Sequence, residues 1–228
     1  SAKAEGNAHL KAGRHDKAIE LYSLAISIDR QNPVYRSNRS ACYQAKGMWA
    51  EAAADARECL NLDVNFVKGF LHLVRCQLQL KSLGDAAKTV QSTPMGMLSA
   101  QPELAALAQT VRDQIKGAGN AALKVGQHQT AIEHYSLAIS LDPTEPVYWS
   151  NRSAAYQAKR AWREALGDAR QAVKLDKLFI KGHLHVGRCL LQLGSPGEAV
   201  SACQDGIASL QEAAQPTATY APLQELLK

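Results

Sequence analysis

Apolar residues recur along most of the chain at the spacing of a helix. Residues 15–29, HDKAIELYSLAISID, carry apolar side chains three or four positions apart, so these side chains line one helical face. Glycine and proline fall between such segments, and no stretch alternates as a half-buried strand would. The pattern predicts an all-α protein, with first-half helices over about 2–13, 16–29, 33–46, 49–62, 65–81 and 83–92.

The helical pattern is written twice. A shift of 113 positions aligns residues 3–90 with residues 116–203 without a gap, so the second half repeats the expected helices. Within each half, small residues such as Ala18, Ala52 and Ala86 recur with a period of 34. That period is the signature of the tetratricopeptide repeat, a helix–turn–helix unit. Each half therefore predicts a superhelical array of three tetratricopeptide repeats.

The segment between the halves predicts a shared long helix. Pro102 suits a first helical turn, and an apolar stripe beginning at Leu104 continues into the second half with no proline from 103 to 142. We expect one helix over about 102–125, capping the first array, and a second capping helix after Pro216. The expected division is a first domain at 1–101, a linking helix at 102–115, a second domain at 116–205, and the end of the last repeat with its capping helix at 206–228.

Composition excludes several classes of function. The net charge of +5 and the aromatic content of 6% are too low for a typical nucleic-acid surface. No apolar run is long enough to predict membrane insertion. The five cysteines form no CxxC pair, so we expect no metal, and we also expect no cofactor. Buried free thiols favour a reducing compartment, so we expect the protein in the cytoplasm, with the nucleus as an alternative. We also expect a monomer. No nucleophile–base pair or phosphate loop predicts an enzyme.

Lysine and asparagine recur on the first helix of each expected helix pair. Lys3 and Asn7 are four positions apart and therefore share one helical face. Asn38 and Lys68 lie on the next two first helices, and the shift of 113 repeats all four as Lys116, Asn120, Asn151 and Lys181. Lysine ammonium groups and asparagine amides are suitable donors for the two carboxylates of a C-terminal aspartate.

The segments AKAEGNAHLKAG, SNRSACYQAKG and FVKGF resemble the tetratricopeptide co-chaperones of the Hop type, and the resemblance covers nearly the whole chain in two copies. It implies a non-catalytic adaptor with two carboxylate clamps. Their ligands would be the EEVD tails of cytosolic heat-shock chaperones of the 70- and 90-kDa classes. By this resemblance Lys3, Asn7 and Asn38 hold the main-chain carboxylate, and Lys68 holds the aspartate side chain.

The chain departs from the family four residues after each second lysine, where His72 and His185 replace the usual arginine. Since a histidine with an ordinary pKa of about 6.5 is mostly neutral at pH 7, we expect clamps that tighten toward pH 6. Arg75 and Arg188 lie near the same face and are candidate substitutes. The expected groove walls are Ala41, Gln44 and Ala45, repeated as Ala154, Gln157 and Ala158.

Two alternatives stay open. The grooves could bind another acidic or internal segment of a partner that is not a chaperone. Alternatively, the lysines are solvated charges, the asparagines satisfy neighbouring backbone and the histidines are packing residues. Recurrence of the whole set at one shift favours the clamp.

Overall fold

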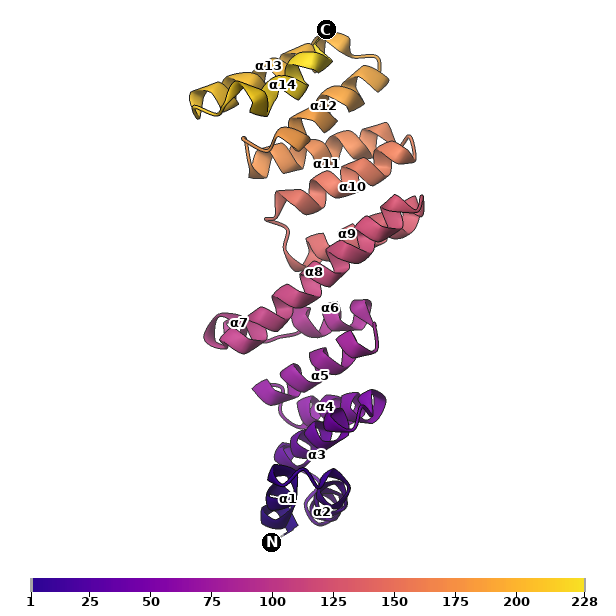
Figure 1. Ribbon diagram of the computed structural model, residues 1–228, viewed down its shortest axis with the longest axis vertical. Helices are drawn as coiled ribbons and strands as arrows, with labels where there is room; N and C mark the ends of the chain where they lie inside the picture. Colours follow the sequence, from indigo (N-terminus) through magenta and orange to yellow (C-terminus); the bar gives the residue numbers. More distant parts are fainter. Residues whose placement is uncertain (1, 228) are drawn as a thin grey trace. The chain divides into compact units, whose positions relative to one another are not determined.

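The computed structural model describes residues 2–227, and every regular element in that range is a helix, which confirms the expected fold class (Figure 1). The helices of the first half are α1 (Ala2–Lys11), α2 (His15–Ile28), α3 (Pro33–Ala45), α4 (Trp49–Leu62), α5 (Val67–Gln79), α6 (Leu83–Gln91) and α7 (Met97–Ala100). They are followed by α8 (Pro102–Lys124), α9 (His128–Leu141), α10 (Pro146–Ala158), α11 (Trp162–Leu175), α12 (Ile180–Gln192), α13 (Pro196–Glu212) and α14 (Thr217–Leu226).

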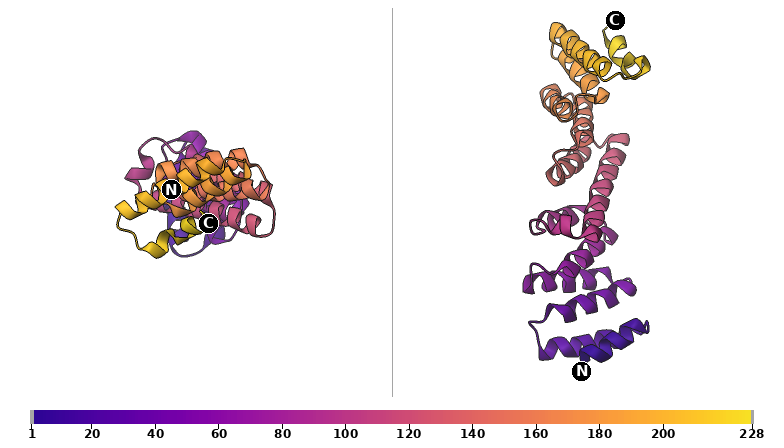
Figure 2. Two further views of the ribbon diagram at one scale, coloured as in Figure 1. Left: turned by 90° about the horizontal axis from the view of Figure 1, so that it is seen from above. Right: turned by 90° about the vertical axis from the view of Figure 1, so that its left-hand side faces the viewer.

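The chain forms two compact units, unit 1 ending at Asp113 and unit 2 beginning at Gln114. Helix α8 contains residues of both, as the uninterrupted apolar stripe predicted. Within unit 1 each helix from α1 to α5 packs against the next one, and α3 and α5 also lie against each other. Within unit 2, α10 and α12 lie against each other in the same way (Figure 2). First helices of successive pairs are therefore neighbours, which brings their polar faces together.

Small residues of the 34-residue period allow the close helix approach. A Cβ on Gly6 would lie only 2.8 Å from the ring of Tyr22, and one on Gly119 would lie 2.7 Å from the ring of Tyr135. Both tyrosines are fully buried. Glycine at these two positions therefore lets a large aromatic ring lie close against the preceding helix.

The two units end differently. Helix α6 stops at Gln91 because Pro94 and the left-handed Gly96, with φ of 81°, interrupt the chain, and the short α7 follows. The same break is missing in unit 2, where α13 continues to Glu212. The shift of 113 predicts an end of that helix near residue 205, so the predicted helix is too short. The sequence pattern did not predict α7.

Each unit closes on a capping segment. In unit 1 Leu104 at the start of α8 is buried against Phe70 and Leu71 of α5. In unit 2 Tyr220 and Leu223 of α14 pack in one cluster with residues of α13. Because these contacts cover the apolar side of the last repeat, they keep each three-repeat stack from ending on exposed core.

All five cysteines are buried free thiols, as expected, and burial raises the pKa of Cys59 to about 12. No helix within residues 2–227 has the length and apolar character to cross a membrane. The described part of the chain also contains no group of three or more His, Cys, Asp or Glu side chains arranged to hold a metal ion.

Candidate functional site

The predicted clamp residues lie on neighbouring first helices. In unit 1, α1 carries Lys3 and Asn7, α3 carries Asn38, and α5 carries Lys68 and His72; we call these five residues cluster 1. Unit 2 places the equivalent residues on α8, α10 and α12, and cluster 2 consists of Lys116, Asn120, Asn151, Lys181 and His185. Specific hydrogen bonds join the helices within each cluster.

The first of these bonds pairs the asparagines. Asn38 Nδ2 donates to Asn7 Oδ1 over 3.1 Å, and the hydroxyl of Tyr22 donates to the same oxygen over 2.7 Å. Asn7 therefore uses its carbonyl oxygen within the protein and presents its amide nitrogen, which carries two donor hydrogens, to a ligand. The two asparagine amides meet although they are 31 residues apart.

Unit 2 repeats this arrangement. Tyr135 donates to Asn120 Oδ1 over 2.7 Å, and Asn151 Nδ2 donates to it over 3.2 Å. Tyr22 and Tyr135, whose hydroxyls orient an asparagine, were not among the candidate residues from the sequence. The available signal was that each tyrosine follows its asparagine by 15 residues in both halves.

A second link joins α3 to α5 through Gln44. Its Nε2 lies 2.8 Å from His72 Nδ1 and 3.4 Å from Ser40 Oγ, and Ser40 donates its own hydrogen to the carbonyl oxygen of Ala52 over 2.8 Å. Gln44 thus donates to His72 Nδ1, which leaves the proton of a neutral ring on Nε2. A neutral His72 therefore still offers one N–H donor.

The corresponding link in unit 2 has nearly the same geometry. Gln157 Nε2 lies 2.7 Å from His185 Nδ1 and 3.3 Å from Ser153 Oγ. Gln44 and Gln157 were expected as groove walls, but here each holds a histidine ring. Of the other expected wall residues, Ala41 and Ala154 are half-buried, and Ala45 and Ala158 are exposed.

Both histidines are poor cations. The pKa of His72 is lowered to about 4, chiefly by burial and then by the charges of Arg75 and Lys68, whereas Glu103 raises it. The pKa of His185 is lowered to about 4 by burial, Arg188 and Lys181. The expectation of clamps that tighten toward pH 6 is therefore wrong, because both rings stay neutral there.

We expect the affinity for an acidic peptide to change less than about twofold between about pH 7.5 and 6, where both rings are neutral and the peptide carboxylates are ionised.

The stability of the fold, in contrast, should respond to pH. Unfolded histidine has a pKa of about 6.5, so between about pH 6.5 and 4 the unfolded chain binds more protons than the folded chain. The free energy of unfolding therefore decreases as the pH is lowered through that window. Thermal unfolding at several pH values, compared with His72→Gln, would measure this; an unchanged pH dependence in the variant would contradict it.

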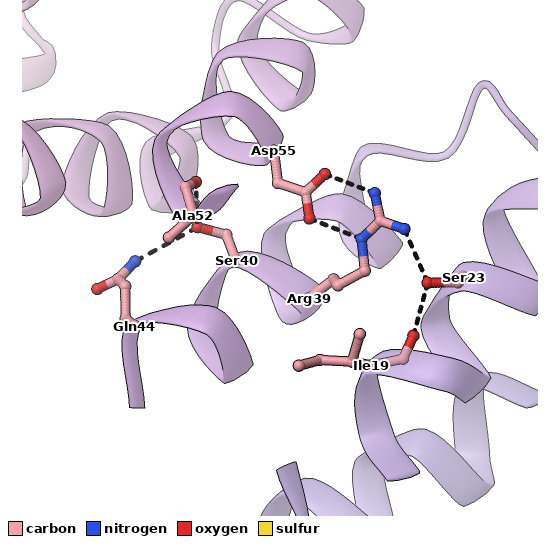
Figure 3. Close-up of polar contacts among 7 residues, drawn as sticks. All are labelled: Ile19, Ser23, Arg39, Ser40, Gln44, Ala52 and Asp55. Atoms are coloured by element: carbon pink, nitrogen blue, oxygen red, sulfur yellow. Dashed lines mark hydrogen bonds and ion pairs between the residues drawn. The ribbon is translucent and has the colours of Figure 1, made fainter. Parts of the chain in front are cut away.

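An ion pair is formed by the residue that follows the asparagine of α3 in the sequence. Arg39 binds Asp55 through two hydrogen bonds of 2.7 Å and donates to Ser23 Oγ over 2.8 Å (Figure 3). Arg152 binds Asp168 and Ser136 in the same way in unit 2. Each arginine therefore ties its own first helix to the second helix of the same repeat and to the second helix of the preceding repeat.

Cluster 2 borders a cavity of about 300 Å³. Its wall contains Asn151 and Lys181 together with Val147, Leu178, Phe179 and Ile180. Carboxylate-binding groups and an apolar hollow therefore lie next to each other, which suits a peptide that ends in an apolar residue followed by an acidic one. These apolar residues were not among the sequence candidates.

The two candidate arginines differ. Arg75 is bonded to Glu103 on α8. Arg188, at the equivalent position of α12, is exposed, and residues 2–227 offer it no ion-pair partner. The sequence alone made the two positions look identical.

Comparisons with known proteins agree with the repeats. The tetratricopeptide repeat family model matches residues 4–32 and 117–145. Hsp70-Hsp90 organizing protein 3 of Arabidopsis thaliana is 37% identical over 234 residues, covering 90% of this chain and 41% of that protein. Small glutamine-rich tetratricopeptide repeat-containing protein 2 of Mycosarcoma maydis is 41% identical over 95 residues, covering 42% of this chain and 27% of its own length. The chain thus spans well under half of these relatives.

Among solved structures, the TPR2AB domain of yeast Sti1 is similar, with a TM-score of 0.47 and 19% identity over 99% of this chain and 95% of that chain. The repeat period, the helix pairs and the sequence matches all indicate the same kind of repeat. The chain therefore contains tetratricopeptide repeats, and Hsp70-Hsp90 organizing proteins are among its sequence relatives.

Proposed function

We propose that the chain is a non-catalytic adaptor whose two units each bind the acidic C-terminal tail of a heat-shock chaperone of the 70- or 90-kDa class. One observation carries the proposal. In each unit a hydrogen-bonded asparagine pair lies on the same set of first helices as two lysines, and Tyr22 or Tyr135 holds the pair so that a free amide nitrogen is presented.

The donors suit a terminal aspartate. In cluster 1 the amide of Asn7 and the ammonium of Lys3, four residues apart on α1, would bind the main-chain carboxylate. Lys68 and the Nε2–H of His72, four residues apart on α5, would bind the side-chain carboxylate. The names of the Hsp70-Hsp90 organizing proteins point to this class of partner. Short peptides held by such exposed contacts bind at about micromolar strength, about −8 kcal/mol.

Calorimetry with EEVD-ending peptides tests the proposal. We expect two sites on the chain and one strong site after Lys68→Ala or Lys181→Ala. Removing a charge-assisted hydrogen bond costs about 1.5–2 kcal/mol, so the affected site should weaken about 10- to 30-fold.

Lys88→Ala on α6 and Lys174→Ala on α11 remove the same charge from a second helix of each unit and serve as matched controls. If these controls weaken binding as much as the cluster variants do, the peptide is attracted only by net charge. If no variant changes the stoichiometry, the clusters are not the binding sites.

A further inference from the structure

The two capping helices differ in charge where each begins. The first turn of α8 carries Glu103 directly after Pro102, whereas α14 begins with Thr217 directly after Pro216 and has no acidic residue in its first turn. Glu103 reaches α5 and forms an ion pair with Arg75. Unit 2 has no counterpart of this pair in the described part of the chain.

The ion pair lies beside cluster 1. Arg75 follows His72 by three residues and Lys68 by seven, so all three lie on one side of α5. The electrostatic influences on His72 agree with this placement, because Arg75, Lys68 and Glu103 all act on it. His185 experiences the charges of Arg188 and Lys181, with no carboxylate among the causes of its pKa shift.

We propose that the two units are unequal receptors, and that unit 2 binds acidic C-terminal peptides more tightly because Arg188 is unpaired there while Glu103 occupies Arg75 in unit 1. The inference deepens the proposed function and rests on it. A glutamate upstream of the terminal aspartate meets an unpaired guanidinium beside cluster 2. Beside cluster 1 it meets a guanidinium already bonded to a carboxylate, and the Glu103 charge repels it.

The size of the difference follows from the exposure of these groups. The side chains of Arg75 and Glu103 are 42% and 63% exposed, so their charges act through solvent. Exposed ion pairs contribute little, and the affinities of the two units should differ about two- to fivefold. Salt should weaken peptide binding to unit 2 more than to unit 1.

The test uses the whole chain with one cluster disabled at a time. With Lys181→Ala the chain reports cluster 1, and with Lys68→Ala it reports cluster 2, for one EEVD-ending peptide titrated in calorimetry. Cluster 2 should bind about two- to fivefold more tightly. Adding Glu103→Gln should strengthen cluster 1 by about the same factor, and adding Arg188→Gln should weaken cluster 2 by it.

Charge-matched controls are Glu51→Gln on α4 and Arg163→Gln on α11, both exposed on second helices. Glu103→Thr, which introduces the residue type found in unit 2, repeats the main test should the glutamine variant fold poorly. Equal affinities of the two clusters, or no gain from either Glu103 substitution, overturn the inference while leaving the proposed function intact. Absence of peptide binding to both clusters overturns the proposed function and the inference with it.

Discussion

Amidation of the C-terminal carboxylate is expected to weaken the binding of an EEVD-ending peptide to either unit about 100-fold. The modification removes the charge and one acceptor oxygen of the main-chain carboxylate, which Lys3 and Asn7 bind in the proposed complex with unit 1. Losing several such contacts, some of them charge-assisted, costs about 3 kcal/mol, which corresponds to about 100-fold in affinity. Calorimetry with the free and amidated forms of one peptide measures the loss.

A peptide with a free C-terminus and asparagine in place of the last aspartate is the matched control. It keeps the main-chain carboxylate and loses only the side-chain charge, so its affinity should fall about tenfold, less than that of the amidated form. An amidated peptide that binds as well as the free one would mean that the grooves accept internal segments. That result would favour a partner of another kind.

Asp55→Ala is expected to lower the free energy of unfolding of unit 1 by about 3 kcal/mol. The side chains of Asp55 and Arg39 are only 8% and 22% exposed, and the pair makes two hydrogen bonds between them. Without the carboxylate, the Arg39 guanidinium is left poorly solvated with Ser23 as its polar contact, and breaking a buried pair in this way costs about 3–5 kcal/mol. The partial exposure of Arg39 favours the lower end.

Urea unfolding of the whole chain, read together with Asp168→Ala in unit 2, measures the effect. Glu20→Ala is the matched control, because it breaks an exposed ion pair in which the side chains of Lys17 and Glu20 are 57% and 66% exposed. This substitution should lower the free energy of unfolding by at most about 0.5 kcal/mol. The double replacement Arg39→Met with Asp55→Leu should be less destabilising than Asp55→Ala alone, since no unpaired charge remains. Equal losses for Asp55→Ala and Glu20→Ala would contradict the role of the pair.

The repeat pattern predicted most of the fold because its determinants are local. The 34-residue period, the glycine turns and the apolar stripe through Leu104 predicted the helix pairs and the shared helix α8. The misplaced end of α13 has a local cause as well. The proline and glycine that end α6 are missing from unit 2, a difference that copying the first half at +113 overlooked.

The candidate site was only partly predictable. Lys3, Asn7, Asn38 and Lys68 could be placed on neighbouring helices, since residues on one helical face follow from spacing alone. The hydroxyl of Tyr22 on Asn7 and the bond from Gln44 to His72 could not, because each joins side chains on different helices and depends on how closely those helices pack.

The sequence by itself determined the number of repeats, their helical nature and the recurrence of lysine and asparagine, all of which depend on residue type and spacing. The tertiary structure decided the state of the groups beside those residues. Burial and nearby cations keep His72 and His185 neutral, where the isolated side chain would begin to titrate near pH 6. Packing of α8 on α5 occupies Arg75, while Arg188 in the same sequence context has no such partner in residues 2–227. Solvation and pairing depend on what surrounds a group in space, and two nearly identical segments therefore acquire different electrostatics.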